Sequence, residues 1–303
     1  MDLSNATYPL DLTDVPYSDT SSLNTLSVHL PRAPVPNDPK RLFVIYIHGG
    51  AWRDPAISAP SFAHTQTYLL SNPTTTSKIS GIATLNYRLS PYPSHPTSPS
   101  NPHDPARNSR HPDHITDVLA AILYLQETYA FGSHYVLVGH SCGATLALQV
   151  AMRRYWGGQY DPTLALELNV EPPVAIVAAE GIHDIPGLVE RNAAQPAYRD
   201  LVVNAFGSDV GAWEQASPVK GDFEEGWEEG RLFVLVHSEA DELVGMDQAD
   251  GIWKVMGEQG FSEEEGSERR RRLVKLQGLK HDEVWEDGKE FAEVIAGAVE
   301  EIA

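Results

Sequence analysis

The feature that most constrains the fold is the pentapeptide Gly-His-Ser-Cys-Gly at residues 139–143. It follows the apolar run 135–138 and precedes a run of helix-forming residues at 144–150. A strand that turns this sharply into a helix imposes strained backbone angles on the serine. The flanking glycines let neighbouring backbone approach without a Cβ clash. We therefore predict that Ser141 projects from the edge of a sheet as a nucleophile, above the N-terminus of a helix.

Apolar segments along the rest of the chain alternate between strand-like and helix-like patterns. We expect strands at 42–47, 79–87, 135–138, 174–179, 232–236 and 272–276. We expect helices at 62–70, 115–129, 144–150 and about 286–302. Repeated strand–helix order predicts an α/β fold, with a mostly parallel sheet and helices on both faces. With 303 residues, 42% of them hydrophobic, the chain is large enough for a single domain over residues 1–303.

Charge and apolar patterning argue against two classes of partner. The net charge is −20, and residues 151–303 hold 14 basic against 32 acidic side chains. Such a surface repels phosphate backbones, so we expect no nucleic-acid binding. No run of about 18 apolar residues is present, so we expect no membrane span. Residues 1–6 lack the basic and apolar regions of a signal peptide.

Cysteine usage points to a reducing compartment. Cys142 is the one cysteine, which permits no internal disulfide and no cysteine-based metal site. A cytoplasmic location is therefore expected. Histidines at 95, 103, 111 and 114 lack the spacing of metal ligands, so we expect no metal there.

Two segments stand apart from the alternating pattern. Residues 90–112 are rich in Pro, Ser, Asn and His, and are expected to form a long, mobile surface loop. Four arginines at 269–272 follow the acidic residues 263–265 and Glu268. We interpret this stretch as a solvated, self-neutralising surface segment rather than a nuclear signal.

Partners for Ser141 follow it in the order acid, then histidine. Asp241 lies in the loop after the predicted strand 232–236. His281 lies between the last predicted strand and the C-terminal helix, and no other histidine follows Asp241. We predict that Ser141, Asp241 and His281 form a catalytic triad. Other acids near the expected position, which we consider weaker candidates, are Glu239, Glu242, Asp184 and Asp247.

An oxyanion hole is predicted where His48-Gly49-Gly50-Ala51-Trp52 follows a buried strand. Glycines can turn their amide N–H groups toward a developing alkoxide, so Gly49 and Gly50 are the expected donors. The N–H of Cys142, at the start of the elbow helix, is the third. Two interpretations of Trp52 stay open: it walls the acyl site or stacks on an aromatic substrate, or it anchors the loop in the core.

These motifs together resemble an α/β-hydrolase of the hormone-sensitive-lipase-like group, and within it the fungal kynurenine formamidases. The resemblance runs from about residue 40 to the C-terminus. Lipase-like esterases of this group usually have a third glycine where this chain has Ala51. The long loop 90–112 and the acidic stretches 221–229 and 262–272 depart from the compact family pattern. The matching segments are HGGAW (48–52), NYRLSP (86–91), HPDHITDVLAAILYL (111–125), GHSCGA (139–144), GIHDI (181–185), ASP (216–218) and the pair Asp241 and His281.

The resemblance implies hydrolysis of N-formyl-L-kynurenine to L-kynurenine and formate, in tryptophan breakdown toward NAD. It implies a small-molecule substrate and no cofactor, and it leaves open an assembly of two copies. A carboxylesterase acting on short acyl or aryl esters would use the same residues and is the alternative. A hydrolase-fold binding protein without activity is disfavoured, because such proteins lose a triad member and this chain keeps all three.

Overall fold

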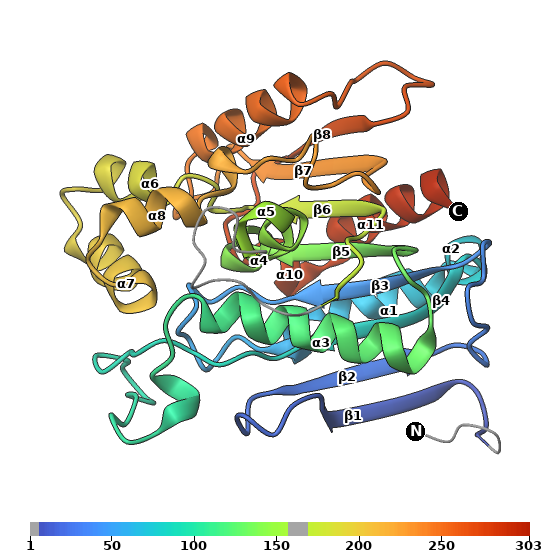
Figure 1. The fold of residues 1–303 in the computed structure, drawn as a ribbon, viewed down its shortest axis with the longest axis horizontal. Helices are drawn as coiled ribbons and strands as arrows, with labels where there is room; N and C mark the ends of the chain where they lie inside the picture. The colour runs from blue at the N-terminus through green and yellow to red at the C-terminus, as the bar shows by residue number, and fades with distance from the viewer. Residues whose placement is uncertain (1–5, 157–168) are drawn as a thin grey trace.

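One sheet with the strand order β1-β2-β4-β3-β5-β6-β7-β8 runs through residues 6–156 and 169–303, which are the residues that the computed structural model describes (Figure 1). Strands β3 to β8 are parallel, whereas β2 pairs antiparallel with both β1 and β4. The bounds are β1 Leu10–Pro16, β2 Thr25–Leu30, β3 Leu42–Ile47, β4 Ile79–Leu85, β5 Tyr135–His140, β6 Ala175–Ala179, β7 Leu232–Ser238 and β8 Arg270–Leu276.

The central strands are buried on both faces because helices cover both sides of the sheet. In β3, β5 and β6 every residue is buried, as expected for parallel strands between two helical layers. One core contains residues of α3, α4 and α9, and the other contains residues of α1 and α11. The helices are α1 Ala63–Ser71, α2 Pro73–Ser77, α3 Asp113–Tyr129, α4 Cys142–Ala151, α5 Arg153–Trp156, α6 Ile185–Arg191, α7 Pro196–Phe206, α8 Val210–Ala216, α9 Met246–Glu258, α10 Glu283–Asp287 and α11 Lys289–Ile302.

The predicted fold class is confirmed, with differences at the edges of the sheet and of the chain. The expected C-terminal helix is two helices, because Gly288 between α10 and α11 has a φ of +74°. Strands β1 and β2 and the helices α6 to α8 had no predicted counterpart. In β2 the sequence TLSVHL alternates strictly between polar and apolar residues, a signal that could have predicted the strand, whereas the alternation in β1 breaks at Thr13 and Asp14. Residues 1–5, part of the segment used to argue against a signal peptide, lie outside the described residues.

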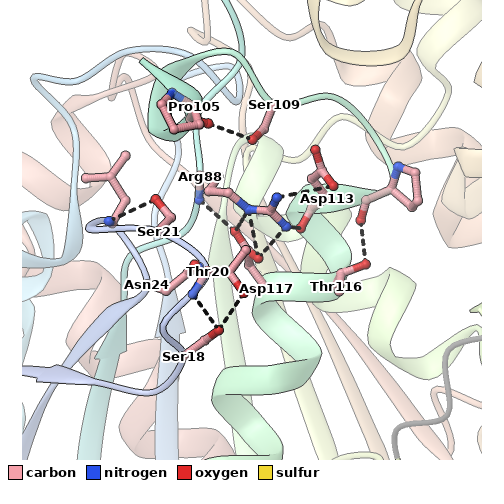
Figure 2. A network of polar contacts seen from close by, with 12 residues as sticks. Ser18, Thr20, Ser21, Asn24, Arg88, Pro105, Ser109, Asp113, Thr116 and Asp117 are labelled. Atoms are coloured by element: carbon pink, nitrogen blue, oxygen red, sulfur yellow. Dashed lines mark hydrogen bonds and ion pairs between the residues drawn. The ribbon is translucent and has the colours of Figure 1, made fainter. Parts of the chain in front are cut away.

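The segment 90–112 forms the predicted loop, but it is anchored at several points. Figure 1 shows it at the carboxyl edge of the parallel strands, on the same side as α6, α7 and α8. At its base, Arg88 forks onto Asp117 of α3 with nitrogen–oxygen distances of 2.8 to 3.1 Å, as Figure 2 shows. Inside the loop, the amides of Thr97 and Ser98 donate to His95 Nδ1. The Ser90 amide donates to the Trp52 carbonyl and the His111 amide to the Ala205 carbonyl, and these bonds hold the loop against the body of the protein.

The arginine cluster is part of the sheet rather than a solvated segment. Arg270 begins the edge strand β8, and both Arg270 and Arg272 pair with Glu301 of α11. Arg271 lies over the ring of Trp253, with 4.2 Å between its guanidinium carbon and the ring centroid. These arginines therefore cover an open sheet edge while neutralising nearby acids. Among the described residues, no helix is both long and apolar enough to cross a membrane.

Candidate active site

Ser141 occupies the predicted turn between β5 and α4. Its φ of 56° and ψ of −124° are strained for a residue with a side chain, and its N–H donates to the Ala179 carbonyl at 2.8 Å. The two glycines are required by close packing. A Cβ on Gly139 would lie 2.3 Å from the Gly143 carbonyl oxygen, and one on Gly143 would lie 2.2 Å from that of Ile47. The backbone geometry of a nucleophile elbow is therefore present.

His281 and Asp241 are joined as predicted. His281 Nδ1 lies 2.7 Å from Asp241 Oδ2, and both side chains are almost completely buried. Asp241 Oδ1 accepts the amides of Leu243 and Val244 at 2.8 Å each. Burial alone would raise the pKa of Asp241. Its hydrogen bonds to His281, Glu180 and the Val244 amide outweigh burial and hold that pKa below the usual range. Asp241 is therefore ionised at neutral pH.

The other acids considered for this role serve elsewhere. Asp184 caps α6 by accepting the Gly187 amide, and Asp247 pairs with Arg191 at 2.8 Å. Glu239 pairs with Lys275. Glu242 accepts the backbone N–H of His281 at 3.2 Å, so it supports the loop without touching the imidazole in a hydrogen bond.

Ser141 and His281 line one cavity of about 390 Å³, a size that suits a small organic molecule. Figure 1 shows α6 and α7 at the carboxyl edge of the sheet, and both helices contribute residues to the cavity wall. The loop 90–112 contributes Tyr92. The segment that composition marks as a mere surface loop thus forms part of the site.

The loop after β3 borders the cavity through Gly50 and Ala51, whereas the sequence predicted Gly49 and Gly50 as the residues that face it. Gly50 and Ala51 line the cavity, both with positive φ. Gly49 lies behind them, where a Cβ would meet His140 Nδ1 at 2.7 Å and Ser141 Cβ at 3.1 Å. The Cys142 N–H is in the first turn of α4, where no carbonyl four residues earlier in a helix can accept it. By position at the cavity, Gly50, Ala51 and Cys142 are the candidate amide donors and Gly49 lies behind them, while the Ala51 amide also contacts the Cys142 thiol.

The structure places Trp52 in the core and outside the cavity lining, which favours its interpretation as an anchor of the loop. Its exposed fraction is 1%, and its ring meets Phe206 edge-on at 5.0 Å between centroids. The Trp52 amide donates to Cys142 Sγ at 3.1 Å, and the Trp52 carbonyl accepts the Ser90 amide. Its backbone φ of 59° turns the side chain inward, away from the cavity. Trp52 anchors the loop, the second of the two interpretations.

Cys142 carries a buried thiol that does not face the cavity. Its sulfur accepts the Trp52 amide and lies 3.6 Å from the Tyr87 hydroxyl. Burial raises the pKa of the thiol to about 11. The reactive thiolate is therefore scarce at neutral pH, and the side chain serves packing.

A second carboxyl group, Glu180, lies beside Asp241 and was not predicted. It is fully buried at the end of β6, and its Oε1 accepts the Ser238 amide at 3.0 Å. Its Oε2 lies 3.4 Å from His237 Nδ1. His237 Nε2 faces the Val244 carbonyl at 2.9 Å and must donate to it, which leaves Nδ1 of the neutral ring as an acceptor.

Glu180 Oε2 and His237 Nδ1 make no hydrogen bond with each other, and the proton of Glu180 is directed at Asp241 instead. Burial, followed by the hydrogen bond to Asp241 and the charge of Asp241, raises the pKa of Glu180 to about 10. Burial also lowers the pKa of His237, in agreement with a neutral ring. The site therefore holds one carboxylate, Asp241, and one carboxylic acid, Glu180. The isolated glutamate at the end of a predicted strand offered no sequence signal for this pairing.

Two groups of side chains bring possible metal-binding atoms within 4.8 Å of one another in the described part of the chain. One combines Glu180, His237 and Asp241, of which Glu180 bonds to the Ser238 amide and Asp241 to His281. The other combines His140, His281 and Asp282, where His140 Nε2 donates to the His281 carbonyl at 2.9 Å. Neither group includes a histidine of the loop 90–112.

Comparisons with known proteins identify the family of this chain. The BD-FAE family model matches residues 27–256. "Kynurenine formamidase-like hydrolase fscH" of Fusarium equiseti is 38% identical over 95% of this chain and 94% of its own length. "Kynurenine formamidase avaC" of Aspergillus versicolor is 36% identical over 80% and 86%. The fold is shared with esterase B of Lactobacillus rhamnosis, with a TM-score of 0.69, 16% identity and coverage of 97% of this chain and 87% of that one. The chain therefore belongs to the kynurenine formamidase family of α/β-hydrolases.

Proposed function

We propose that this hydrolase cleaves N-formyl-L-kynurenine to L-kynurenine and formate, with Ser141 as nucleophile. The observation that carries the proposal is that Ser141 and His281 line one substrate-sized cavity while His281 is bonded to the buried Asp241. The relatives named kynurenine formamidases supply the substrate class. The reaction needs an activated hydroxyl, a proton carrier and an oxyanion site, all of which this cavity can provide.

In the first half of the reaction, Ser141 Oγ attacks the formyl carbon and its proton passes to His281 Nε2. The carbonyl electron pair moves onto oxygen, which is stabilised by the amides of Gly50, Ala51 and Cys142. When this intermediate collapses, the carbon–nitrogen bond breaks and His281 returns the proton to the departing aryl amine. The aromatic ring delocalises the nitrogen lone pair, so the aniline leaves more readily than an aliphatic amine.

In the second half, water attacks formyl-Ser141 and gives a proton to His281. Collapse breaks the bond to Ser141 Oγ, which takes the proton back as formic acid leaves and ionises to formate. Asp241 keeps His281 in the tautomer with its proton on Nδ1 and stabilises the imidazolium formed in each half. No step requires a cofactor.

The cellular setting proposed for this reaction is the cytoplasm, supported by the single cysteine, which the structure buries as a free thiol. We propose that the small-molecule substrate is the partner on which the site acts. Assembly into a homodimer is compatible with this site, because the residues of the mechanism all come from one chain.

The test is a comparison of kcat/KM for N-formylkynurenine and for a short aryl ester such as 4-nitrophenyl butyrate. We expect clear preference for the formamide, and loss of hydrolysis by at least about 10³-fold in Ser141→Ala. Ser77→Ala is the matched control, since Ser77 is exposed and precedes β4 at the opposite edge of the sheet. Preference for the butyryl ester would favour the carboxylesterase alternative, and an active Ser141→Ala protein would refute the serine mechanism.

A further inference from the structure

Arg53 brings a permanent positive charge to the cavity of Ser141, and among the described lining residues it is the only arginine or lysine. Its amide donates to the Gly50 carbonyl at 3.0 Å, which fixes its backbone to the loop of the proposed oxyanion donors. Its guanidinium carbon lies 4.0 Å from the ring centroid of Tyr92, another lining residue. The aromatic ring thus supports the guanidinium at the cavity wall.

This guanidinium has no bonded anion in the described part of the chain, where it makes neither an ion pair within 4.0 Å nor a side-chain hydrogen bond. The neighbouring Asp54 is engaged with the Ala56 amide at 2.9 Å and with His95 Nε2 at 3.3 Å. Arg88 offers a contrast, because Asp117 fills its fork, as Figure 2 shows. A partly buried guanidinium with an empty fork is suited to bind a carboxylate.

Burial lowers the pKa of Arg53 from its ordinary value, and the charges of Tyr92, Asp200 and Asp54 oppose this. Arg53 is half-buried, so water has been partly removed from the cation. An anion that enters the cavity would replace that water and meet the donors already oriented. The chain as a whole carries a net charge of −20, so a single cation at the mouth of the site also distinguishes it from the surrounding surface.

We propose that Arg53 binds the α-carboxylate of the substrate's amino-acid head group, with Tyr92 as its platform. The inference rests on the proposed function and adds the residue that recognises the head group. In N-formylkynurenine the formamide and the amino-acid chain are attached to adjacent carbons of one ring. When the formyl carbon is at Ser141, the head group must therefore lie within the same cavity, where Arg53 is the available cation.

The experiment uses N-formylkynurenine and its carboxamide analogue, in which the carboxylate is replaced by an uncharged amide. The measured quantity is the ratio of the two kcat/KM values in each protein preparation, which does not depend on the fraction of folded enzyme. We expect this ratio to fall by about 10- to 100-fold in Arg53→Gln, mainly through KM, because a charge-assisted hydrogen bond is lost. Arg53→Lys keeps the charge without the fork and should lie between the two.

Arg199→Gln is the matched control, because Arg199 is an exposed arginine that also lies over an aromatic ring, Trp213, but outside the cavity lining. Its ratio should equal that of the wild type. If the wild type hydrolyses both compounds and Arg53→Gln leaves the ratio unchanged, the role of Arg53 is refuted while the proposed function stands. If the wild type hydrolyses neither compound, the proposed function fails, and the inference fails with it.

Discussion

Replacing Glu180 with glutamine should stabilise the protein, and the gain should grow with pH. Glu180 keeps its proton in the folded state, where its pKa is raised from 4.5 to about 10. In the unfolded chain it ionises as the pH rises through its ordinary pKa. The unfolded state then binds fewer protons than the folded state, so the stability of the wild type falls between these two values. Glutamine does not titrate and removes this loss.

The size of the effect follows from the proton linkage. Above the pKa of Glu180 in the unfolded chain, each pH unit lowers the free energy of unfolding of the wild type by about 1.4 kcal/mol. From pH 5 to pH 7 the advantage of Glu180→Gln should therefore increase by about 2.5 kcal/mol. Glutamine also keeps an oxygen for the Ser238 amide and a donor for Asp241, so the local bonds survive. Activity at pH 7 should survive with them, because the single negative charge on Asp241 is unchanged.

The assay is urea unfolding at pH 5, 6 and 7, with the free energy of unfolding compared between Glu180→Gln and the wild type. Glu239→Gln serves as the control, since Glu239 is an exposed acid whose side chain pairs only at the surface with Lys275. Its difference from the wild type should stay nearly constant over the same range. A constant difference for Glu180→Gln as well would show that Glu180 is ionised in the folded protein and would refute the assignment of its proton.

Three further predictions test the site. Asp241→Asn should lower kcat by about 10³- to 10⁴-fold because the His281 imidazolium loses its anion, whereas an equal loss in Asp247→Asn would point to the wrong acid. Cys142→Ala should retain at least about a tenth of the activity, since the backbone donor remains. Cys142→Ser should unfold at a higher urea concentration than Cys142→Ala, because the serine hydroxyl restores an acceptor for the Trp52 amide. If both variants were inactive, the thiol itself would be implicated in the reaction. Trp52→Ala should cost about 3–5 kcal/mol of stability while leaving the kcat/KM ratio for N-formyl over N-acetyl kynurenine unchanged; a narrower ratio would return Trp52 to the acyl site.

Much of the site could be predicted from the order of motifs along the chain. The elbow around Ser141 is local, because strand, glycines, serine and helix are consecutive, and steric limits on the backbone allow few alternatives. The parallel sheet orients every strand the same way, so loops after different strands meet at one edge. This is why Asp241 and His281, each placed after a predicted strand, are found bonded to each other at 2.7 Å.

Properties that depend on the direction of a side chain or an amide were decided by the packing. The motif at 48–52 marks the oxyanion loop, yet the positive φ values at Gly50, Ala51 and Trp52 turn Trp52 into the core and bring Ala51 to the cavity. Glu180 is 61 positions from Asp241, and only their burial in one site lets the protonated Glu180 bond to the ionised Asp241. In the sequence Arg53 cannot be distinguished from a surface arginine. Only the structure shows that its guanidinium lies over the Tyr92 ring without a bonded anion in the described residues. Sequence patterns reflect local backbone preferences and order, whereas burial and pairing arise between residues that are distant in the chain.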